Sequence, residues 1–302
     1  MKKILVSGAN GYIALHLIQA LREHGHQVIT ASRHPDSDLF MDFSKPEQIA
    51  DLRVDGIDAM IHTVSPKESL FKTDIYQAVS ENSAGIHAAL DFCVKNRIEN
   101  FIYFSSFHVF GSREGLLDET TPPAPANDYG LAHYVAEQTV QMYDRQNKLN
   151  AWVIRPSNLF GVPVDSGRFG RWNLIPFAFC KEAAERRRIT LLTPGNQRRN
   201  FVGVHDVCRI VLWILENEEA RSHHLIHAYG KKTMSILEYA GLVQETASRI
   251  LREPVRIIRP GGAGGAVRLE FTSVCRFPEI RPRDDLSAFV NEMVKAVLSS
   301  AK

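Results

Sequence analysis

The sequence has few of the features that mark several large classes of protein. Its four cysteines stand apart, with no C-x-x-C pair and no histidine at metal-ligand spacing. We therefore expect buried thiols in a reducing compartment and predict no metal site. The 36 basic and 34 acidic residues are mixed along the chain and leave a net charge of +2. This balance argues against a nucleic-acid partner.

Long hydrophobic runs and internal repeats are also missing. No apolar run is long enough to cross a membrane. The first run, Ile4–Val6, is too short for the apolar part of a secretion signal. We therefore expect a soluble, cytoplasmic protein that acts away from membranes. At 302 residues the chain is long enough to bury a large core.

The most informative pattern is KILVSGANGYIA at residues 3–14. Its apolar run predicts a strand that is covered on both faces. Gly8 and Gly11 allow a tight turn, and the small Ala14 lets the following helix pack close to the strand. The N-terminus of that helix offers backbone N–H groups and a positive dipole end, which favour a pyrophosphate. The pattern therefore predicts dinucleotide binding rather than a turn that serves packing alone.

Short apolar runs alternate with amphipathic stretches after this turn, and the alternation predicts an α/β protein with a doubly wound parallel sheet of the Rossmann type. The next predicted strands are 27–31, 39–41, 59–63 and 101–104, and the long predicted helices are 75–95 and 128–144. Further on, helices are predicted at 173–187, 205–216, 234–251 and 286–298, and strands at 189–192 and 201–204.

Two domains are expected from this order of elements. Residues 1–160, with 200–230 returning to them, are predicted to bind the dinucleotide. Residues 161–302 are predicted to form mainly a smaller C-terminal substrate-binding lobe. The glycine-rich run at 260–265 precedes no periodic helix, so we interpret it as a surface loop rather than a second phosphate loop.

The end of the second predicted strand bears on the choice of cofactor. Ser32-Arg33-His34 stands where this fold meets the adenosine ribose, and it contains no acidic residue to accept hydrogen bonds from the ribose hydroxyls. Arg33 can instead pair with a 2′-phosphate. We therefore predict NADP as cofactor, with NAD as the alternative. Ligands of such sheets lie beyond the carboxyl ends of the strands. The residues expected along that edge are Gly8, Arg33, Asp42, Thr63 and Ser106.

Tyr129 and Ser106 are the predicted catalytic pair. Tyr129 lies at the start of a predicted helix, and Ser106 follows a predicted strand. A tyrosine near a serine hydroxyl and a nicotinamide can pass a proton to a carbonyl oxygen as hydride moves to carbon. Because its unperturbed pKa is about 10, it needs a nearby positive charge to ionise easily at neutral pH.

These motifs resemble those of the extended short-chain dehydrogenase/reductase family, of the NAD-dependent epimerase/dehydratase type, over nearly the whole chain. The matching pieces are Gly8, Gly11 and Ala14, the segment SSFHVFG from Ser105, Tyr129 with Glu137, Arg155-Pro156-Ser157 before Leu159-Phe160-Gly161, and RNFVGVHDV from Arg199. The resemblance implies that Ser106 hydrogen-bonds the substrate oxygen, that Tyr129 is the general acid/base, and that Arg199 contacts the diphosphate of a nucleotide sugar. It also implies a homodimer that pairs the helices beginning near Ile75 and Tyr129.

The predicted site contains three groups of residues. The predicted catalytic residues are Ser106, Tyr129 and His133. The predicted cofactor contacts are Gly8, Asn10, Gly11, Tyr12, Ile13, Arg33, Asp42, Phe43, Thr63, Asn82, Ser105, Tyr129, His133, Arg155 and Pro156. The predicted substrate contacts are Ser65, His108, Asn158 and Arg199, and His108 is either a second proton donor or a packing residue.

One residue departs from the family's Y-x-x-x-K motif. The fourth residue after Tyr129 is His133, and the flanking Gly130 and Glu137 fix the alignment. In the family, the lysine holds the nicotinamide ribose and lowers the pKa of the tyrosine. A histidine has an unperturbed pKa near 6.5 and is mostly neutral at about pH 7, so we expect weaker proton transfer unless the site raises that pKa.

Four functions are compatible with the sequence. The leading one is an NADP-dependent reductase of a keto group on a nucleotide-activated sugar, with Tyr129 as proton donor. A nucleotide-sugar epimerase with tightly bound NAD is the first alternative, and the absence of an acidic residue beside Arg33 disfavours it. A reductase of hydrophobic substrates is disfavoured by Arg199. A non-catalytic dinucleotide sensor or structural subunit remains open because of His133.

Overall fold

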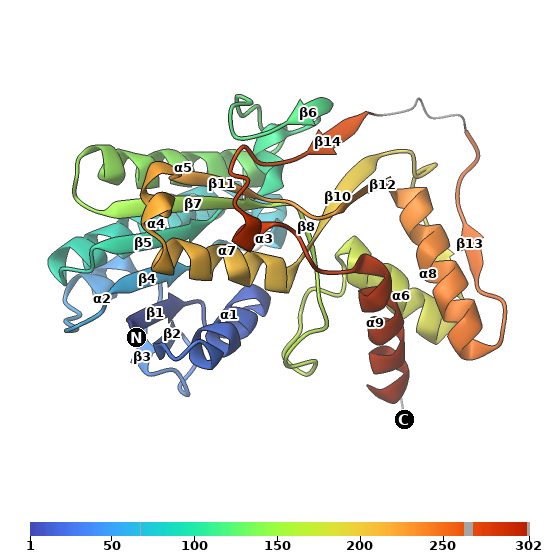
Figure 1. Ribbon diagram of the computed structural model, residues 1–302, viewed down its shortest axis with the longest axis horizontal. Helices are drawn as coiled ribbons and strands as arrows, with labels where there is room; N and C mark the ends of the chain where they lie inside the picture. The colour runs from blue at the N-terminus through green and yellow to red at the C-terminus, as the bar shows by residue number, and fades with distance from the viewer. Residues whose placement is uncertain (67, 263–267, 301–302) are drawn as a thin grey trace. The chain divides into compact units, whose positions relative to one another are not determined.

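In the computed structural model, the described residues are 1–66, 68–262 and 268–300, and they form two compact units (Figure 1). The first unit contains Met1–Arg113, Glu119–Pro156 and Cys208–His227. The second contains Glu114–Asp118, Ser157–Val207 and the chain from Ala228 onward. Helix α7 (Val204–Glu216) crosses the boundary. The return to the first unit therefore begins at Cys208 and not at residue 200, where the sequence had suggested it.

A seven-stranded sheet forms the centre of the first unit, in the order β11-β7-β5-β4-β1-β2-β3. Its strands are β1 (Lys3–Ser7), β2 (Gln27–Ser32), β3 (Leu39–Phe40), β4 (Ala59–His62), β5 (Asn100–Phe104), β7 (Asn150–Pro156) and β11 (Leu225–Ala228). The pairings from β3 through β7 are all parallel. The chain reverses its winding between β1 and β4, and such a switch point places a crevice at the carboxyl ends of the strands. The predicted doubly wound fold class is confirmed.

The helices of the first unit bury apolar side chains against this sheet. They are α1 (Tyr12–Glu23), α2 (Pro46–Ala50), α3 (Glu68–Thr73), α4 (Ile75–Lys95) and α5 (Asp128–Arg145), with the short 3₁₀ turns η1 (Phe107–Phe110) and η2 (Glu218–Ser222). Ile86 and Leu90 of α4 and Val140 of α5 share one core with Leu5 and Phe101 of the sheet. Fully burying a side chain of this size stabilises the fold by roughly 1.5–3 kcal/mol.

Side-chain caps fix where α4 and α5 begin. The Asp74 carboxylate accepts a hydrogen bond from the Gln77 backbone N–H at 3.0 Å. The Asn127 amide oxygen accepts one from the Gly130 N–H at 2.8 Å. Such caps satisfy backbone donors that the first turn leaves without a helical partner. The cap of α5 places Tyr129 in that first turn.

The second unit is built from short strands and three longer helices. Three strands pair in the order β12-β10-β8, namely β12 (Lys232–Ser235), β10 (Arg198–Gly203) and β8 (Asn158–Phe160). Two parallel pairs join β9 (Arg188–Thr190) to β13 (Arg256–Ile258) and β6 (Gly115–Leu117) to β14 (Leu269–Phe271). The helices are α6 (Ile175–Arg186), α8 (Ile236–Leu251) and α9 (Leu286–Ser300), and the 3₁₀ turn η3 covers Pro278–Ile280.

The predicted helices of this unit agree with the structure apart from their ends. The helix predicted at 234–251 begins two residues later, because Met234 and Ser235 belong to β12 and Ser235 caps α8. The strands of three or four residues in this unit were mostly missed, since such lengths show no clear alternation. Of the glycine-rich run, residues 263–265 lie outside the described part of the chain, and Gly261 and Gly262 belong to no helix or strand.

The four cysteines are free thiols, and all of them are buried. Burial raises the pKa of the Cys180 thiol to about 12, so that thiol stays protonated at neutral pH. Among the described helices, none combines the length and the hydropathy that a membrane span requires.

Candidate active site

A cavity of about 930 Å³ lies at the carboxyl edge of the sheet in the first unit. Its size falls within the range of small-molecule sites, roughly 300–1,000 Å³. The predicted residues that line it are Gly8, Asn10, Gly11, Arg33, Asp42, Phe43, Ser65 and Asn82. These residues follow four different strands or lie on α4, so the fold gathers them as the sequence suggested.

The glycine turn shapes one wall of this cavity. Gly8 has a φ of +72°, and a Cβ atom there would lie 2.7 Å from the Thr63 hydroxyl oxygen. The Gly11 N–H donates to the Gly8 carbonyl at 2.7 Å, and α1 starts at the next residue. Among the described residues, none caps α1 with its side chain. A helix N-terminus that opens on a cavity in this way suits an anion, so the turn fits a dinucleotide pyrophosphate.

Three predicted cofactor contacts lie beside the cavity rather than among its lining residues. Tyr12 and Ile13 are the first two residues of α1. The Thr63 hydroxyl donates to the Ser7 carbonyl at 2.7 Å, which places Thr63 directly behind Gly8. Thr63 therefore sets the shape of the turn, and its contact with a cofactor stays a prediction.

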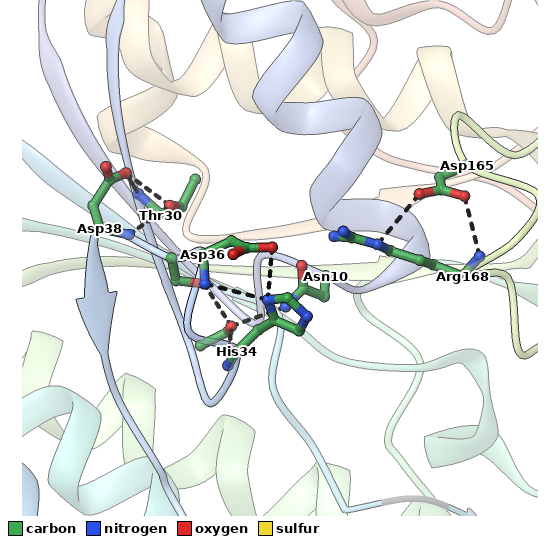
Figure 2. A network of polar contacts seen from close by, with 9 residues as sticks. Asn10, Thr30, His34, Asp36, Asp38, Asp165 and Arg168 are labelled. Atoms are coloured by element: carbon green, nitrogen blue, oxygen red, sulfur yellow. Dashed lines mark hydrogen bonds and ion pairs between the residues drawn. The ribbon is translucent and has the colours of Figure 1, made fainter.

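Arg33, an exposed residue directly after β2, also lines the cavity. The neighbouring Ser32 hydroxyl oxygen accepts hydrogen bonds from the Asn10 amide and from the His34 N–H, each at 2.9 Å. His34 Nδ1 lies 3.3 Å from an Asp36 carboxylate oxygen (Figure 2). These contacts order the loop that presents Arg33.

The two carboxylates after Arg33 lie outside the set of residues that line the cavity. Asp36 is the partner of His34. Asp38 accepts from both the backbone N–H and the hydroxyl of Thr30, at 2.8 and 2.7 Å, as Figure 2 shows. These two hydrogen bonds, with the larger effect from the backbone N–H, hold the pKa of Asp38 below its usual value. Asp38 is therefore fixed against β2 as a carboxylate.

Of the described residues that line the cavity, Asp42 and Glu81 carry a carboxylate. Asp42 directly follows Met41 in the chain and lies after β3. Its Oδ1 accepts from the backbone N–H and the hydroxyl of Ser44, at 3.1 and 2.7 Å. The residue is 8% exposed. Its position after β3 agrees with the predicted place beside the adenine, although that contact stays a prediction.

Several lining residues were missed by sequence reasoning. They are Ser32, His34, Pro35, Met41, Ser44, His62, Val64, Pro66, Ser69, Leu70, Thr73, Gln77, Glu81, Gly85, Ile86, Tyr103 and Ala136. Two of them, His62 and Tyr103, end or nearly end strands of the parallel sheet, a position that could have identified them. Those on α3 and α4 depend on how the helices pack, which periodicity alone does not indicate.

His62 is a neutral, buried histidine in the wall of the cavity. It is 2% exposed, and its Nδ1 lies 2.8 Å from the Ser7 hydroxyl. Its ring meets the ring of Phe43 edge-on, with centroids 4.7 Å apart. Burial lowers the pKa of His62 to about 3 because the charged form would lose its hydration.

The predicted catalytic residues gather where η1 meets the start of α5. The ring centroid of Tyr129 lies 4.6 Å from that of His133 and 5.5 Å from that of His108. A Cβ atom on Gly130 would overlap the His108 carbonyl, so only glycine allows this approach of the two elements. The Ser106 hydroxyl oxygen caps η1 by accepting from the His108 N–H at 3.2 Å.

Asn82 connects the cavity to this catalytic group. It lines the cavity from α4, and its side-chain amide donates to the Ala132 carbonyl on α5 at 3.0 Å. Ala132 directly precedes His133, which is 3% exposed. His133 in turn accepts from or donates to the Tyr103 hydroxyl through Nδ1 at 2.8 Å. Tyr103 also lines the cavity.

Ser105 and Arg155 lie in a buried polar cluster rather than among the lining residues. Both are joined to Glu137, which is 0% exposed. Arg155 donates to the two carboxylate oxygens at 2.8 and 2.6 Å, and the Ser105 hydroxyl donates to one of them. Pro156 ends β7 and is also buried. The sequence had assigned Ser105, Arg155 and Pro156 to the cofactor, an assignment that stays a prediction.

The remaining predicted substrate contacts belong to the second unit. Asn158 on β8 donates to the Asn200 carbonyl at 3.0 Å, and its strand pairs with β10. Arg199 lies on β10 and is partly buried, and burial lowers the pKa of its guanidinium. Arg199 donates to the Arg198 carbonyl at 3.0 Å.

Comparison with known proteins gives the family. Residues 4–227 match the model of the NAD-dependent epimerase/dehydratase family. An ADP-L-glycero-D-manno-heptose-6-epimerase from Thiobacillus denitrificans is 27% identical over 235 residues, which are 71% of this chain and 70% of the relative.

Two solved structures share the fold over the whole chain. A UDP-glucose 4-epimerase from Thermotoga maritima, solved with UDP-glucose, has a TM-score of 0.78 at 20% identity and covers 99% of this chain and 100% of its own. RMD from Pseudomonas aeruginosa, complexed with NADPH, has a TM-score of 0.79 at 17% identity and covers 99% of this chain and 100% of its own. The resemblance inferred from the motifs is confirmed, and the chain is an enzyme. It belongs to the NAD-dependent epimerase/dehydratase family.

Proposed function

We propose that this enzyme is an NADP-dependent oxidoreductase that reduces a keto group of a nucleotide-activated sugar. The observation that carries the proposal is the grouping of Tyr129, Ser106 and His133 in the unit that also contains the dinucleotide cavity. A bound reduced nicotinamide would supply the hydride. The protein residues would orient the carbonyl and deliver the proton.

Each catalytic side chain has a defined task in this proposal. The Tyr129 hydroxyl gives its proton to the carbonyl oxygen while hydride reaches the carbonyl carbon, so the product is an alcohol. Ser106 hydrogen-bonds the same oxygen and fixes its distance from Tyr129. When its imidazole is protonated, His133, in contact with the Tyr129 ring, provides a positive charge that stabilises the tyrosinate left by the proton transfer and so makes Tyr129 a stronger proton donor.

The position of Arg33 supports NADP as the cofactor. Arg33 is exposed and lines the cavity after β2, while Asp36 and Asp38 are engaged with His34 and Thr30. A guanidinium pairs with a phosphate through charge-assisted hydrogen bonds, whereas a carboxylate at this place would repel it. NAD is the alternative cofactor, because members of this fold are known with each dinucleotide.

A nucleotide sugar is the proposed substrate class. The curated relative is named for an ADP-heptose, and one structural neighbour contains UDP-glucose. The second unit is the proposed substrate lobe, in which Arg199 would contact the diphosphate and Asn158 the sugar. Ser65 and His108 of the first unit are the other proposed substrate contacts.

An epimerase is the second candidate function, and the names of two relatives favour it. An epimerase would oxidise and then reduce one sugar carbon with the same bound NAD. The two candidates differ in stoichiometry, because a reductase consumes one NADPH for each sugar, whereas an epimerase leaves the amount of cofactor unchanged.

A direct assay tests the proposal against the epimerase and the non-catalytic sensor. The protein is mixed with NADPH and a panel of nucleotide 4-keto sugars between about pH 5.5 and about pH 8, where a histidine changes charge. We expect loss of NADPH absorbance, and none with the Tyr129→Phe variant, which should still bind NADPH. In a parallel mixture with NAD and nucleotide sugars that carry a hydroxyl in place of the keto group, a change of configuration without net formation of NADH would show that the protein is an epimerase. Binding of both ligands without turnover would support the sensor.

We also propose that the enzyme is a cytoplasmic homodimer formed through α4 and α5. Large apolar side chains are exposed on these two packed helices, among them Tyr76, Val79, Leu131 and Val135. Pairing this surface with its copy would remove these side chains from water. The four buried free thiols support a reducing compartment.

A further inference from the structure

We propose that Tyr103 is the positioning residue of His133, and that its hydroxyl holds the imidazole in the orientation that faces Tyr129. Tyr103 stands near the end of β5, and its Oη lies 2.8 Å from His133 Nδ1. The His133 ring also meets the Tyr129 ring edge-on, with centroids 4.6 Å apart. The inference rests on the proposed function, in which Tyr129 moves the proton.

The Tyr103 hydroxyl is suited to this task because it stays protonated. Tyr103 is 1% exposed. Burial, and then the charges of Glu137 and Tyr129, raise the pKa of its phenol well above the usual value. A neutral hydroxyl both donates and accepts hydrogen bonds. It can therefore donate to Nδ1 of a neutral imidazole and accept from the Nδ1–H of an imidazolium, so it can hold His133 in both charge states.

The other titratable groups near His133 each have contacts of their own. Glu137, one turn later on α5, is joined to Arg155. His62 of β4 stacks on the Tyr103 ring with centroids 6.3 Å apart, and its lowered pKa keeps it neutral. The His108 ring, in η1, meets the Tyr129 ring edge-on, with centroids 5.5 Å apart. From α4, the neutral Asn82 amide holds the Ala132 carbonyl beside His133.

We expect this arrangement to select one tautomer of neutral His133. A histidine nitrogen that accepts a hydrogen bond from a hydroxyl places the ring proton on the other nitrogen. With Tyr103 donating to Nδ1, the proton of the neutral ring is on Nε2. Tyr103→Phe removes the phenol hydroxyl and keeps the aromatic ring. The imidazole of His133 should then populate both neutral tautomers and lose its fixed orientation, without a change in the packing.

Nuclear magnetic resonance of ¹⁵N-histidine-labelled full-length protein, free of ligands, tests this directly. We expect the His133 resonances, assigned with His133→Gln, to show one dominant Nε2–H tautomer above the pH at which the ring titrates. In Tyr103→Phe the two tautomers should mix. The matched control is Tyr143→Phe, which removes a hydroxyl that bonds Asp91 elsewhere along α5. An unchanged tautomer population in Tyr103→Phe would overturn the proposal, whether or not the protein reduces a sugar.

Turnover provides the second arm of the test. Tyr103→Phe should lower kcat about fivefold to tenfold, as expected for one hydrogen bond, with little change in the KM for NADPH. The same substitution should also shift the acidic limb of the plot of kcat against pH. In a His133→Ala background the same substitution should have no further effect. An equal loss in that background would show that Tyr103 acts independently of His133. If no variant reduces any sugar, the proposed function fails while the resonance experiment still decides the role of Tyr103.

Discussion

Two buried histidines of the first unit differ in what their side chains contact. His62 is enclosed by Phe43, Phe101 and the backbone of the sheet, and its hydrogen-bond partner is the neutral Ser7 hydroxyl. Its charged form is therefore costly, and it serves as a fixed wall of the cavity. His133 contacts two tyrosines instead, so its charge and orientation bear on the proposed proton transfer.

The buried His62 should make the enzyme sensitive to acid. Its pKa is about 3 in the folded protein and about 6.5 when unfolded. Between these values the unfolded chain binds the proton and the folded one does not, so stability is complete above about pH 6.5 and falls with decreasing pH. We expect His62 to contribute a loss of about 1.4 kcal/mol per pH unit below about pH 5.5.

Urea unfolding of the ligand-free enzyme at several pH values measures this loss. The comparison is His62→Asn, which keeps a polar partner for Ser7 and has no group that titrates there. The free energy of unfolding of the variant should be lower at neutral pH but should fall less steeply on acidification. Parallel pH curves for the two proteins would contradict the prediction.

Arg33 is the residue on which the proposed cofactor preference depends. Arg33→Asp replaces a phosphate partner by a carboxylate that accepts from ribose hydroxyls, so the preference should reverse toward NAD. We expect the dissociation constant of NADP to rise by about tenfold to a hundredfold. Calorimetric titration with each dinucleotide measures it. Arg53→Asp makes the same charge change at an exposed loop residue outside the cavity lining, and it should leave both affinities nearly unchanged.

At the scale of elements, α5 combines several tasks along one face. Tyr129, His133 and Glu137 follow one another at four-residue spacing, so they share one side of the helix. The first two belong to the proposed catalytic group, and the third binds Arg155 of β7 and Ser105 after β5. The ion pair therefore connects the helix to two strands. The segment that contains Ser106 begins directly after one of these contacts.

Breaking this ion pair should destabilise the fold more than breaking an exposed one. In Glu137→Gln, Arg155 remains buried at 2% exposure without a full countercharge. We expect a loss of about 3–5 kcal/mol in the free energy of unfolding, measured by urea titration. The matched control is Glu185→Gln, which breaks the exposed pair with Lys181 on α6 and should cost at most about 0.5 kcal/mol. Equal losses in the two variants would contradict the importance of the buried pair.

At the scale of the whole molecule, the two units carry different parts of the proposed reaction. The dinucleotide cavity and the catalytic group belong to the first unit. Arg199, the proposed diphosphate contact, belongs to the second. A ligand that binds only the folded protein raises its stability, so NADP and a nucleotide sugar should each raise the melting temperature.

The proposed homodimer is also a property of the whole molecule. Leu131→Glu places a charge on the exposed apolar surface of α4 and α5 and should convert the dimer to a monomer. Light scattering coupled to size-exclusion chromatography measures the mass. Leu192→Glu is the control, because Leu192 is 92% exposed on the other unit and lies on neither helix. A wild-type protein with the mass of one chain would refute the dimer.

The sequence by itself determined the parts that depend on near neighbours in the chain. The strand, glycine turn and helix at residues 3–14 were predicted correctly because turn geometry and helix starts are set within a few residues. The alternation of strands and helices predicted the parallel sheet for the same reason. The motifs around Tyr129 predicted the family, since their residue types and spacing are visible without folding the chain.

Only the tertiary structure decided which distant side chains meet. Tyr103 and His133 are 30 residues apart, and Ser7 and His62 are 55 apart. Glu137 was recognised as part of a motif, but its contact with Arg155 was found only in the fold. Burial, and with it the charge state of a group, depends on such nonlocal packing. The chemistry proposed for His133 is therefore decided by a strand that enters the site from elsewhere in the chain.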